Sequence, residues 1–168
     1  MDNTTTMDHA EFTARRSLPM MALRGLTVFP GMMLTFEVER SMSIAALNMA
    51  MSDDQIIYLV PQKDIATDIP TPDDVYGVGT VCRIKQMMKQ PGSKTVRVMA
   101  EGIERGRTLA VRTDMPCFVA EVEPMPDVEE RKTARTEALI RHCCNLFDAY
   151  VTASGNMAPE SVISVLGS

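Results

Sequence analysis

Three neighbouring residues carry the side chains with the most evident chemistry. His142, Cys143 and Cys144 put an imidazole beside two thiols, the pairing that activates a cysteine nucleophile when base and thiol lie within hydrogen-bond reach. They fall in a stretch whose apolar residues repeat at helical spacing, and adjacent residues on a helix point about 100° apart. The sequence therefore predicts no thiol dyad, and it places Cys143 in the apolar stripe of a helix with His142 on its flank.

Other catalytic and metal-binding patterns are absent from the sequence. It contains neither a G-x-x-x-x-G-K-[ST] phosphate loop nor a G-x-S-x-G nucleophile elbow. A zinc site would take four ligands, and no more than three soft ligands are close together. His9 stands in a polar leader, and the acidic pairs Asp53-Asp54 and Asp73-Asp74 are typical of turns and caps. We expect no catalytic, cofactor-binding or metal-binding residue in this chain.

Methionine gives the remaining chemical signal, with fifteen copies against five phenylalanines and no tryptophan. Strict alternation along the hairpin predicted around residues 90–93 places Met87 and Met99 on its polar face, and Met33 lies among polar residues on an earlier strand. Methionine is flexible and polarizable, which suits a surface that accepts many partners. We predict that Met33, Met87 and Met99 form an adaptable apolar surface for unfolded polypeptide. The alternative is that a helix or the C-terminal bundle covers them.

A β-rich architecture must position these side chains. Apolar runs, alternation and turn signals predict six or seven strands, which cover residues 18–23, 32–38, 56–60, 79–88, 94–101, 108–112 and 116–122. Helical spacing over residues 41–51 predicts one short helix, with Ser41 as its cap. Glycines at Gly102 and Gly106 indicate bulges or a corner where the sheet curls. The strand count and these corners predict a curled sheet or small barrel.

The segment from Gln62 to Gly79 is rich in proline and aspartate and is predicted as a long surface loop. Four apolar side chains are expected to anchor it to the core: Ile65, Ile69, Val75 and Tyr76.

The C-terminal part is predicted to be helical. Asp127 and Glu130 have the spacing of a capping box, and a helix of about six turns should run to Ser154. A further helix opens near Pro159, and we expect it to continue beyond Ser168 in a longer polypeptide. The predicted organisation is a disordered leader (residues 1–17), a β-rich subdomain (residues 18–123) and the start of a helical subdomain (residues 124–168).

Composition limits the classes of function. The net charge is −5, which argues against a nucleic-acid-binding module, since the compact basic patch is limited to Arg83, Lys85 and Arg97. No apolar run approaches the roughly 20 residues that span a bilayer, and the N-terminus has no signal-peptide core. Four scattered cysteines fit reduced, mostly buried thiols. We therefore expect a cytoplasmic protein without membrane contact.

Four segments, in the same order, resemble a known family. Residues 18–31 follow the pattern L-P-x-x-x-L-R-x-x-x-x-F-P-G, and three further matches follow at LVPQKD (59–64), PTPDDVYGVGT (70–80) and EGIER (101–105). Together they resemble the N-terminal domain of Lon proteases, closely over residues 18–123 and more loosely beyond.

The resemblance implies an α+β fold: a β-rich curled-sheet or pseudo-barrel (PUA-like) subdomain with one short helix, followed by a C-terminal helical segment. It implies a domain that recognises unfolded or degron-bearing proteins and supports assembly of an ATP-dependent serine protease. The hexameric ATPase, its ATP and Mg²⁺, and the peptidase would lie outside this chain, which itself would have no cofactor. Two alternatives stay open: a stand-alone protein-binding adaptor with the same domain, and a PUA-like RNA-binding module.

Overall fold

The computed structural model describes residues 14–89, 92–126 and 133–154. The chain forms two compact units, residues 1–126 and residues 127–168. Among the described residues, the first unit contains six strands and one short α-helix, and the second contains one longer helix. This confirms the predicted fold class, a β-rich unit followed by a helical segment.

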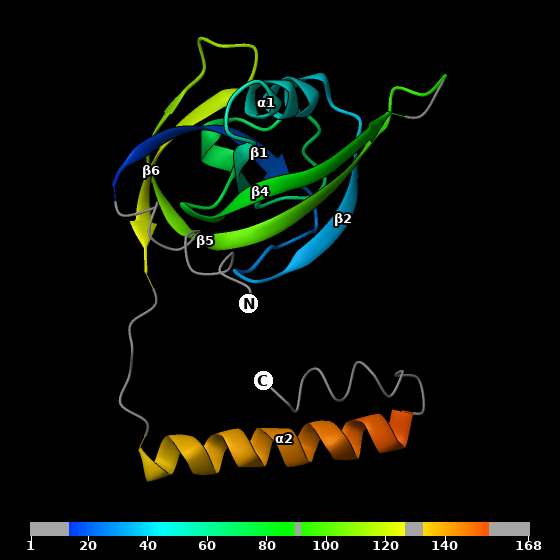
Figure 1. Ribbon diagram of the computed structural model, residues 1–168, viewed down its shortest axis with the longest axis vertical. Coiled ribbons are helices and arrows are strands. Elements are labelled where there is room, and N and C mark those ends of the chain that lie inside the picture. The colour runs from blue at the N-terminus through cyan, green and yellow to red at the C-terminus, as the bar shows by residue number, and fades with distance from the viewer. Residues whose placement is uncertain (1–13, 90–91, 127–132, 155–168) are drawn as a thin grey trace, which may run out of the picture. The chain divides into compact units, whose positions relative to one another are not determined.

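The six strands close on themselves. They hydrogen-bond in the order β2-β5-β4-β3-β1-β6, and the second half of β5 also pairs with β6. That pairing closes five strands into a ring, with β2 added beside the first half of β5 (Figure 1). Residues 108–112, predicted as a separate strand, are the far end of β5. The strands are β1 (Arg16–Leu23), β2 (Met33–Val38), β3 (Ile56–Pro61), β4 (Val78–Lys89), β5 (Val96–Arg112) and β6 (Phe118–Met125).

The central strands β1 and β3 run parallel and are buried on both faces, which explains their unbroken apolar sequences. Alternate residues enter two different hydrophobic clusters. Met20 and Tyr58 belong to one, and Met21 and Leu59 to the other, which α1 helps to cover. The Tyr58 hydroxyl is fully buried and donates to the carbonyl oxygen of Gly106 at 2.8 Å.

Both ends of the β unit extend further than predicted. β1 begins at Arg16 because Arg16 and Ser17 pair with Val122 and Glu121 of β6, so these two residues are not part of a leader. Residues 1–13 of the predicted leader lie outside the described residues. At the other end β6 continues to Met125, since the residue at 124 still pairs with β5.

The short helix α1 (Ser41–Met51) packs against β1 and β3, with Ala46, Leu47 and Ala50 buried. Ser41 was predicted as its cap, and this is wrong. Arg40 occupies the N-cap position, its carbonyl accepts from the N–H of Ile44 at 2.9 Å, and no side chain caps the helix.

The loop between β3 and β4 contains one turn of 3-10 helix, η1 (Pro72–Asp74). Of its four predicted apolar anchors, Val75 is buried, whereas Ile65, Ile69 and Tyr76 are at least half exposed, so three of the four predictions are wrong. Polar contacts hold the loop instead. The buried side-chain amide of Gln62 donates to the carbonyl oxygens of residues 64 and 67 at 2.7 and 2.6 Å.

The second unit contains α2 (Ala134–Ser154), and the stop predicted at Gly155 and Asn156 lies outside the described residues. Its start differs from the prediction, because the Thr133 hydroxyl accepts from the N–H of Thr136 at 3.2 Å and so acts as the cap. The capping pair predicted at Asp127 and Glu130 lies outside the described residues. No described helix is long and apolar enough to cross a membrane.

Candidate functional site

The outer surface of β2, β5 and β4 presents three methionines, Met33, Met99 and Met88, which we call the methionine face. Met33 and Met88 are 54% and 46% exposed, and Met99 is half-buried between them. Met33 pairs with Glu101 and Met88 with Arg97, so each is one diagonal step from Met99. Diagonal neighbours lie about 7–8 Å apart, within reach of long side chains.

Two of the three predicted binding residues are therefore on one face, and the third is not. The pairing of β4 with β5 shifts between Ile84 and Gln86, which leaves Lys85 as an extra residue on β4. Met87 consequently lies opposite the buried Val98 and packs half-buried against the core. The prediction that Met87 faces outward is wrong, because one inserted residue reverses every later side chain of the strand.

The same bulge brings Met88 to the outer face. Strict alternation from Cys82 through position 88 would instead put Met88 on the core side of the strand. No residue type in this stretch, such as a glycine, signals the extra residue. The pairing partners on β5 were needed to detect it.

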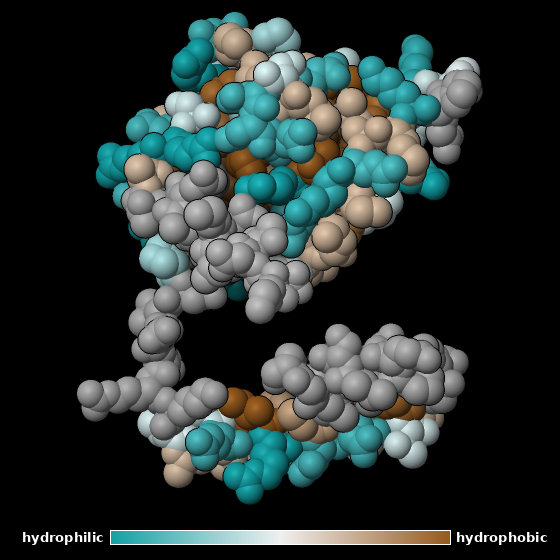
Figure 2. All heavy atoms as spheres, in the orientation of Figure 1, coloured by the Kyte–Doolittle hydropathy of each residue, from teal (hydrophilic) through white to brown (hydrophobic). Residues whose placement is uncertain are grey.

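Ion pairs border the methionine face. Arg97 contacts Glu37 at 2.8 Å on the neighbouring strand, and Lys85 contacts Glu101 at 2.6 Å. Such exposed pairs contribute about 0–1 kcal/mol each, so their main effect is to balance charge. They also neutralise two cations of the basic patch considered for RNA binding. In the view of Figure 2, hydrophobic and hydrophilic residues alternate over the β unit without a wide patch of either kind.

A turn before β2 extends the apolar surface. Phe29 and Met32 are 48% and 38% exposed, and the guanidinium of Arg105 lies 5.7 Å from the centre of the Phe29 ring. The turn is fixed to β5 by two hydrogen bonds of 2.8 Å, from the Gly31 N–H to the Gly102 carbonyl and from the Gly102 N–H to the Met32 carbonyl.

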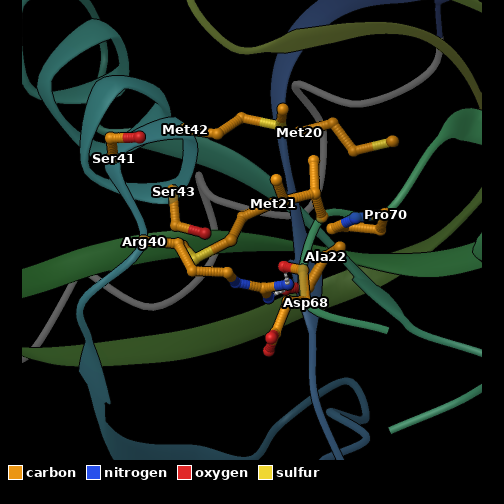
Figure 3. A pocket seen from close by; sticks show the side chains of 10 residues that line it. Met20, Met21, Ala22, Arg40, Ser41, Met42, Ser43, Asp68 and Pro70 are labelled. Atoms are coloured by element: carbon orange, nitrogen blue, oxygen red, sulfur yellow. Dashed lines mark hydrogen bonds between the residues drawn. The ribbon is translucent and has the colours of Figure 1, made fainter. Parts of the chain in front are cut away.

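A separate cavity of about 200 Å³ lies where α1 begins. Figure 3 shows side chains from β1, from the start of α1 and from the loop after β3 converging on it. A second hollow of about 240 Å³ shares Met21, Ala22, Arg40 and Ser43 with the first. The lining of the first cavity is Met20, Met21, Ala22, Arg40, Ser41, Met42, Ser43, Asp68, Ile69 and Pro70. No motif in the sequence marked this site, because its parts come from three distant segments.

Arg40 ties these segments together. Its guanidinium donates to the carbonyl oxygen of Ala22 at 2.5 Å, to the side-chain oxygen of Gln62 at 3.1 Å and to the carbonyl oxygen of Asp68 at 3.5 Å. Burial lowers the pKa of Arg40 from its ordinary value, and the positive charge of Arg24 lowers this pKa further, while Asp68 raises it. The group stays charged, since arginine does not lose its proton in proteins.

The four cysteines differ in their exposure. Cys82 is buried, and burial raises its thiol pKa to about 12, while burial also raises the pKa of Cys117. Cys143 is exposed on α2 and Cys144 half-buried, so the prediction of mostly buried thiols holds for two of the four. Within the described residues, no group of three or more histidine, cysteine or acidic side chains is placed to hold a metal. His9 lies outside them.

The fold of this chain has counterparts among solved structures. Its closed sheet matches the solved N-terminal domain of Mycobacterium avium complex Lon protease with a TM-score of 0.71, at 20% identity, over 89% of this chain and 74% of that one. At this level of identity the match shows the fold alone.

The sequence comparisons show the family. Residues 17–167 match the model of the ATP-dependent protease La (LON) substrate-binding domain, and the chain belongs to that family. It is 36% identical to the Lon protease of Clostridioides difficile over 97% of this chain and 20% of the relative. It is 42% identical to the Lon protease of Desulforamulus reducens over 90% of this chain and 18% of the relative. The chain thus spans about a fifth of the length of the curated relatives it matches.

Proposed function

We propose that this domain binds unfolded or degron-bearing polypeptides through the methionine face and delivers them to a Lon-type protease. The observation that carries the proposal is the diagonal row of Met33, Met99 and Met88 on a sheet that is otherwise polar on this side. Flexible thioether side chains adapt to many apolar sequences, which a quality-control domain must accept.

The surrounding ion pairs support the same role. Glu37 and Arg97, like Lys85 and Glu101, satisfy one another, so the face shows no excess of either charge to exclude acidic or basic clients. Each methionine contributes a small contact area, so binding by one copy should be weak. Six copies acting on one client would raise the apparent affinity through effective concentration.

At the level of the whole protein, we infer an ATP-dependent serine protease that removes misfolded and regulatory proteins. Its hexameric ATPase would require ATP and Mg²⁺, and its peptidase would lie in another part of the polypeptide. A cytoplasmic location is in keeping with the four free cysteines, since reduced thiols are typical of that compartment.

The direct test is binding to a fluorescently labelled, chemically unfolded protein, with the folded form of the same protein as a control. A variant with Met33, Met88 and Met99 replaced by serine should bind the unfolded form at least about fivefold more weakly, which is about 1 kcal/mol. The matched control replaces Met51 and Met115, which are 36% and 38% exposed elsewhere on the β unit, and should bind like the unchanged protein.

The two variants separate the possible outcomes. Equal losses in both would mean that any exposed methionine contributes, and unchanged binding in both would remove the methionine face from substrate capture. Circular dichroism of each variant confirms that a loss of binding is not a loss of fold.

A further inference from the structure

The first turn of α1 lies open toward the cavity described above. The N–H groups of Ser41, Met42 and Ser43 precede the first intrahelical hydrogen bond, which joins Ile44 to Arg40. No side chain caps this turn, and no acidic residue lies in it. The positive end of the helix dipole is therefore not balanced by a carboxylate of the first turn.

The hydroxyl of a mostly buried residue faces the same space. Ser43 is 7% exposed, and its side chain has no hydrogen-bond partner among the described residues. Figure 3 shows the hydroxyl pointing from α1 toward Met21 and Arg40. The hydroxyl is therefore free to bond a ligand that enters the hollow, because it has no partner in the described part of the chain to give up.

The charge around the hollow favours an anion. The partners of Arg40 are the carbonyl oxygens of Ala22 and Asp68 and the neutral side chain of Gln62. The carboxylate of Asp68 is bonded at 2.8 Å to a second arginine, Arg24. Arg24, and not Arg40, thus holds this carboxylate, so the guanidinium of Arg40 has no carboxylate among its hydrogen-bond partners in the described residues.

The rest of the wall is apolar. Met20, Met42 and Pro70 line the cavity, and Ile69 stands at its edge with 79% of its surface exposed. A volume of about 200 Å³ accommodates one amino-acid residue and is below the size usual for larger ligands.

We propose that this cavity binds the C-terminal residue of a client polypeptide, with its carboxylate at Arg40, Ser43 and the first N–H groups of α1 and its apolar side chain against Met20 and Met42. A C-terminal residue with an apolar side chain carries that side chain and a carboxylate on the same α-carbon. An internal aspartate or glutamate has its carboxylate in place of the apolar group, so it would leave the wall unfilled. The inference rests on the proposed function, because it names a second feature of the clients.

The test uses the full chain and a fluorescein-labelled hexapeptide of alternating glycine and serine that ends in leucine. Fluorescence polarisation should show the free acid binding at least about tenfold more tightly than the C-terminal amide, as expected for charge-assisted hydrogen bonds. A peptide with the leucine replaced by glycine tests the apolar wall, and an amidated peptide with an internal glutamate tests the other source of carboxylate. Both should bind about as weakly as the amide.

Substitution Ser43→Val narrows the hollow and removes the hydroxyl, and it should abolish the preference for the free acid. The control Ser52→Ala changes an exposed serine at the far end of the same helix and should keep it. Arg40→Gln should also abolish the preference, with circular dichroism to show that the loop is still folded.

The inference is overturned if acid and amide bind equally, if neither binds at millimolar concentration, or if the internal glutamate peptide matches the free acid. Binding of unfolded protein through the methionine face is measured separately. Its persistence in Ser43→Val would show that failure here leaves the proposed function intact.

Discussion

Replacing Gly102 with alanine should destabilise the β unit strongly. A Cβ atom at this position would overlap the carbonyl oxygen of Phe29 well inside 3.0 Å, a separation that real Cβ contacts essentially never go below. The obstacle is backbone, and the same turn is joined to Gly102 by two hydrogen bonds of 2.8 Å. The alanine variant can therefore fold only if the turn that carries Phe29 and Met32 moves away.

The expected cost follows from those contacts. Losing two backbone hydrogen bonds costs about 2 kcal/mol, and residual overpacking adds about 1 kcal/mol or more. The lower entropy of the unfolded chain with alanine returns about 0.4–1 kcal/mol. We expect a net loss of about 2–3 kcal/mol in the free energy of unfolding, or roughly 6–12 °C in Tm for a unit of this size.

Urea unfolding followed by circular dichroism measures this loss. Gly77→Ala is the matched control, because no atom lies within 4 Å of its added Cβ and its backbone is in an ordinary conformation. It should be neutral or slightly stabilising. The reasoning fails if the free energies of unfolding of Gly102→Ala and Gly77→Ala differ by less than about 0.5 kcal/mol, which is the usual effect of a surface substitution. Binding of unfolded protein should also weaken in Gly102→Ala, since the turn leads into β2.

Three further outcomes are expected. Met87→Ser should lose about 1–2 kcal/mol of stability in urea unfolding and keep client binding, because the bulge turns Met87 inward. Met88→Ser should keep its stability and lose client binding, because the bulge turns Met88 outward. Equal effects of the two substitutions would refute this strand register. Burial raises the pKa of Cys82 from 9.0 to about 12, so the unfolded chain ionises first and stability falls as pH rises between those values. Cys82→Ala should reduce that alkaline slope. Tyr58→Phe should cost about 1–2 kcal/mol by leaving the Gly106 carbonyl without its donor, and a calorimetric change near zero would contradict this.

The sequence determined the local elements well, because each has its own pattern. The apolar runs at β1 and β3 are buried on both faces, and the alternation of β2 matches its burial. Helical spacing predicted both α-helices, and α2 covers Ala134–Ser154. Such patterns reflect the periodicity of one element and need no knowledge of its partners.

The loop after β3 shows where this local information ends. Ile65 and Ile69 are apolar residues of the kind that anchor a loop to a core, and yet they are 62% and 79% exposed. The contacts that hold the loop come from polar side chains: Gln62 bonds to backbone carbonyls within the loop, and Arg40 bonds to the carbonyl of Asp68 from a distant segment. Hydropathy cannot identify such partners, because they depend on which segments the fold brings together.

The sequence alone predicted part of the proposed binding surface. The abundance of methionine indicated an adaptable surface, and alternation placed Met33 and Met99 on the outer face. The third methionine of the face is known only from the tertiary structure, since the extra residue Lys85 turns Met87 toward the core and Met88 to the outer face. The cavity at α1 likewise exists only in the folded chain, where Arg40 joins β1 to the loop. The physical reason is the same in both cases: pairing between distant segments fixes register and proximity, and neither is encoded in the period of a single strand or helix.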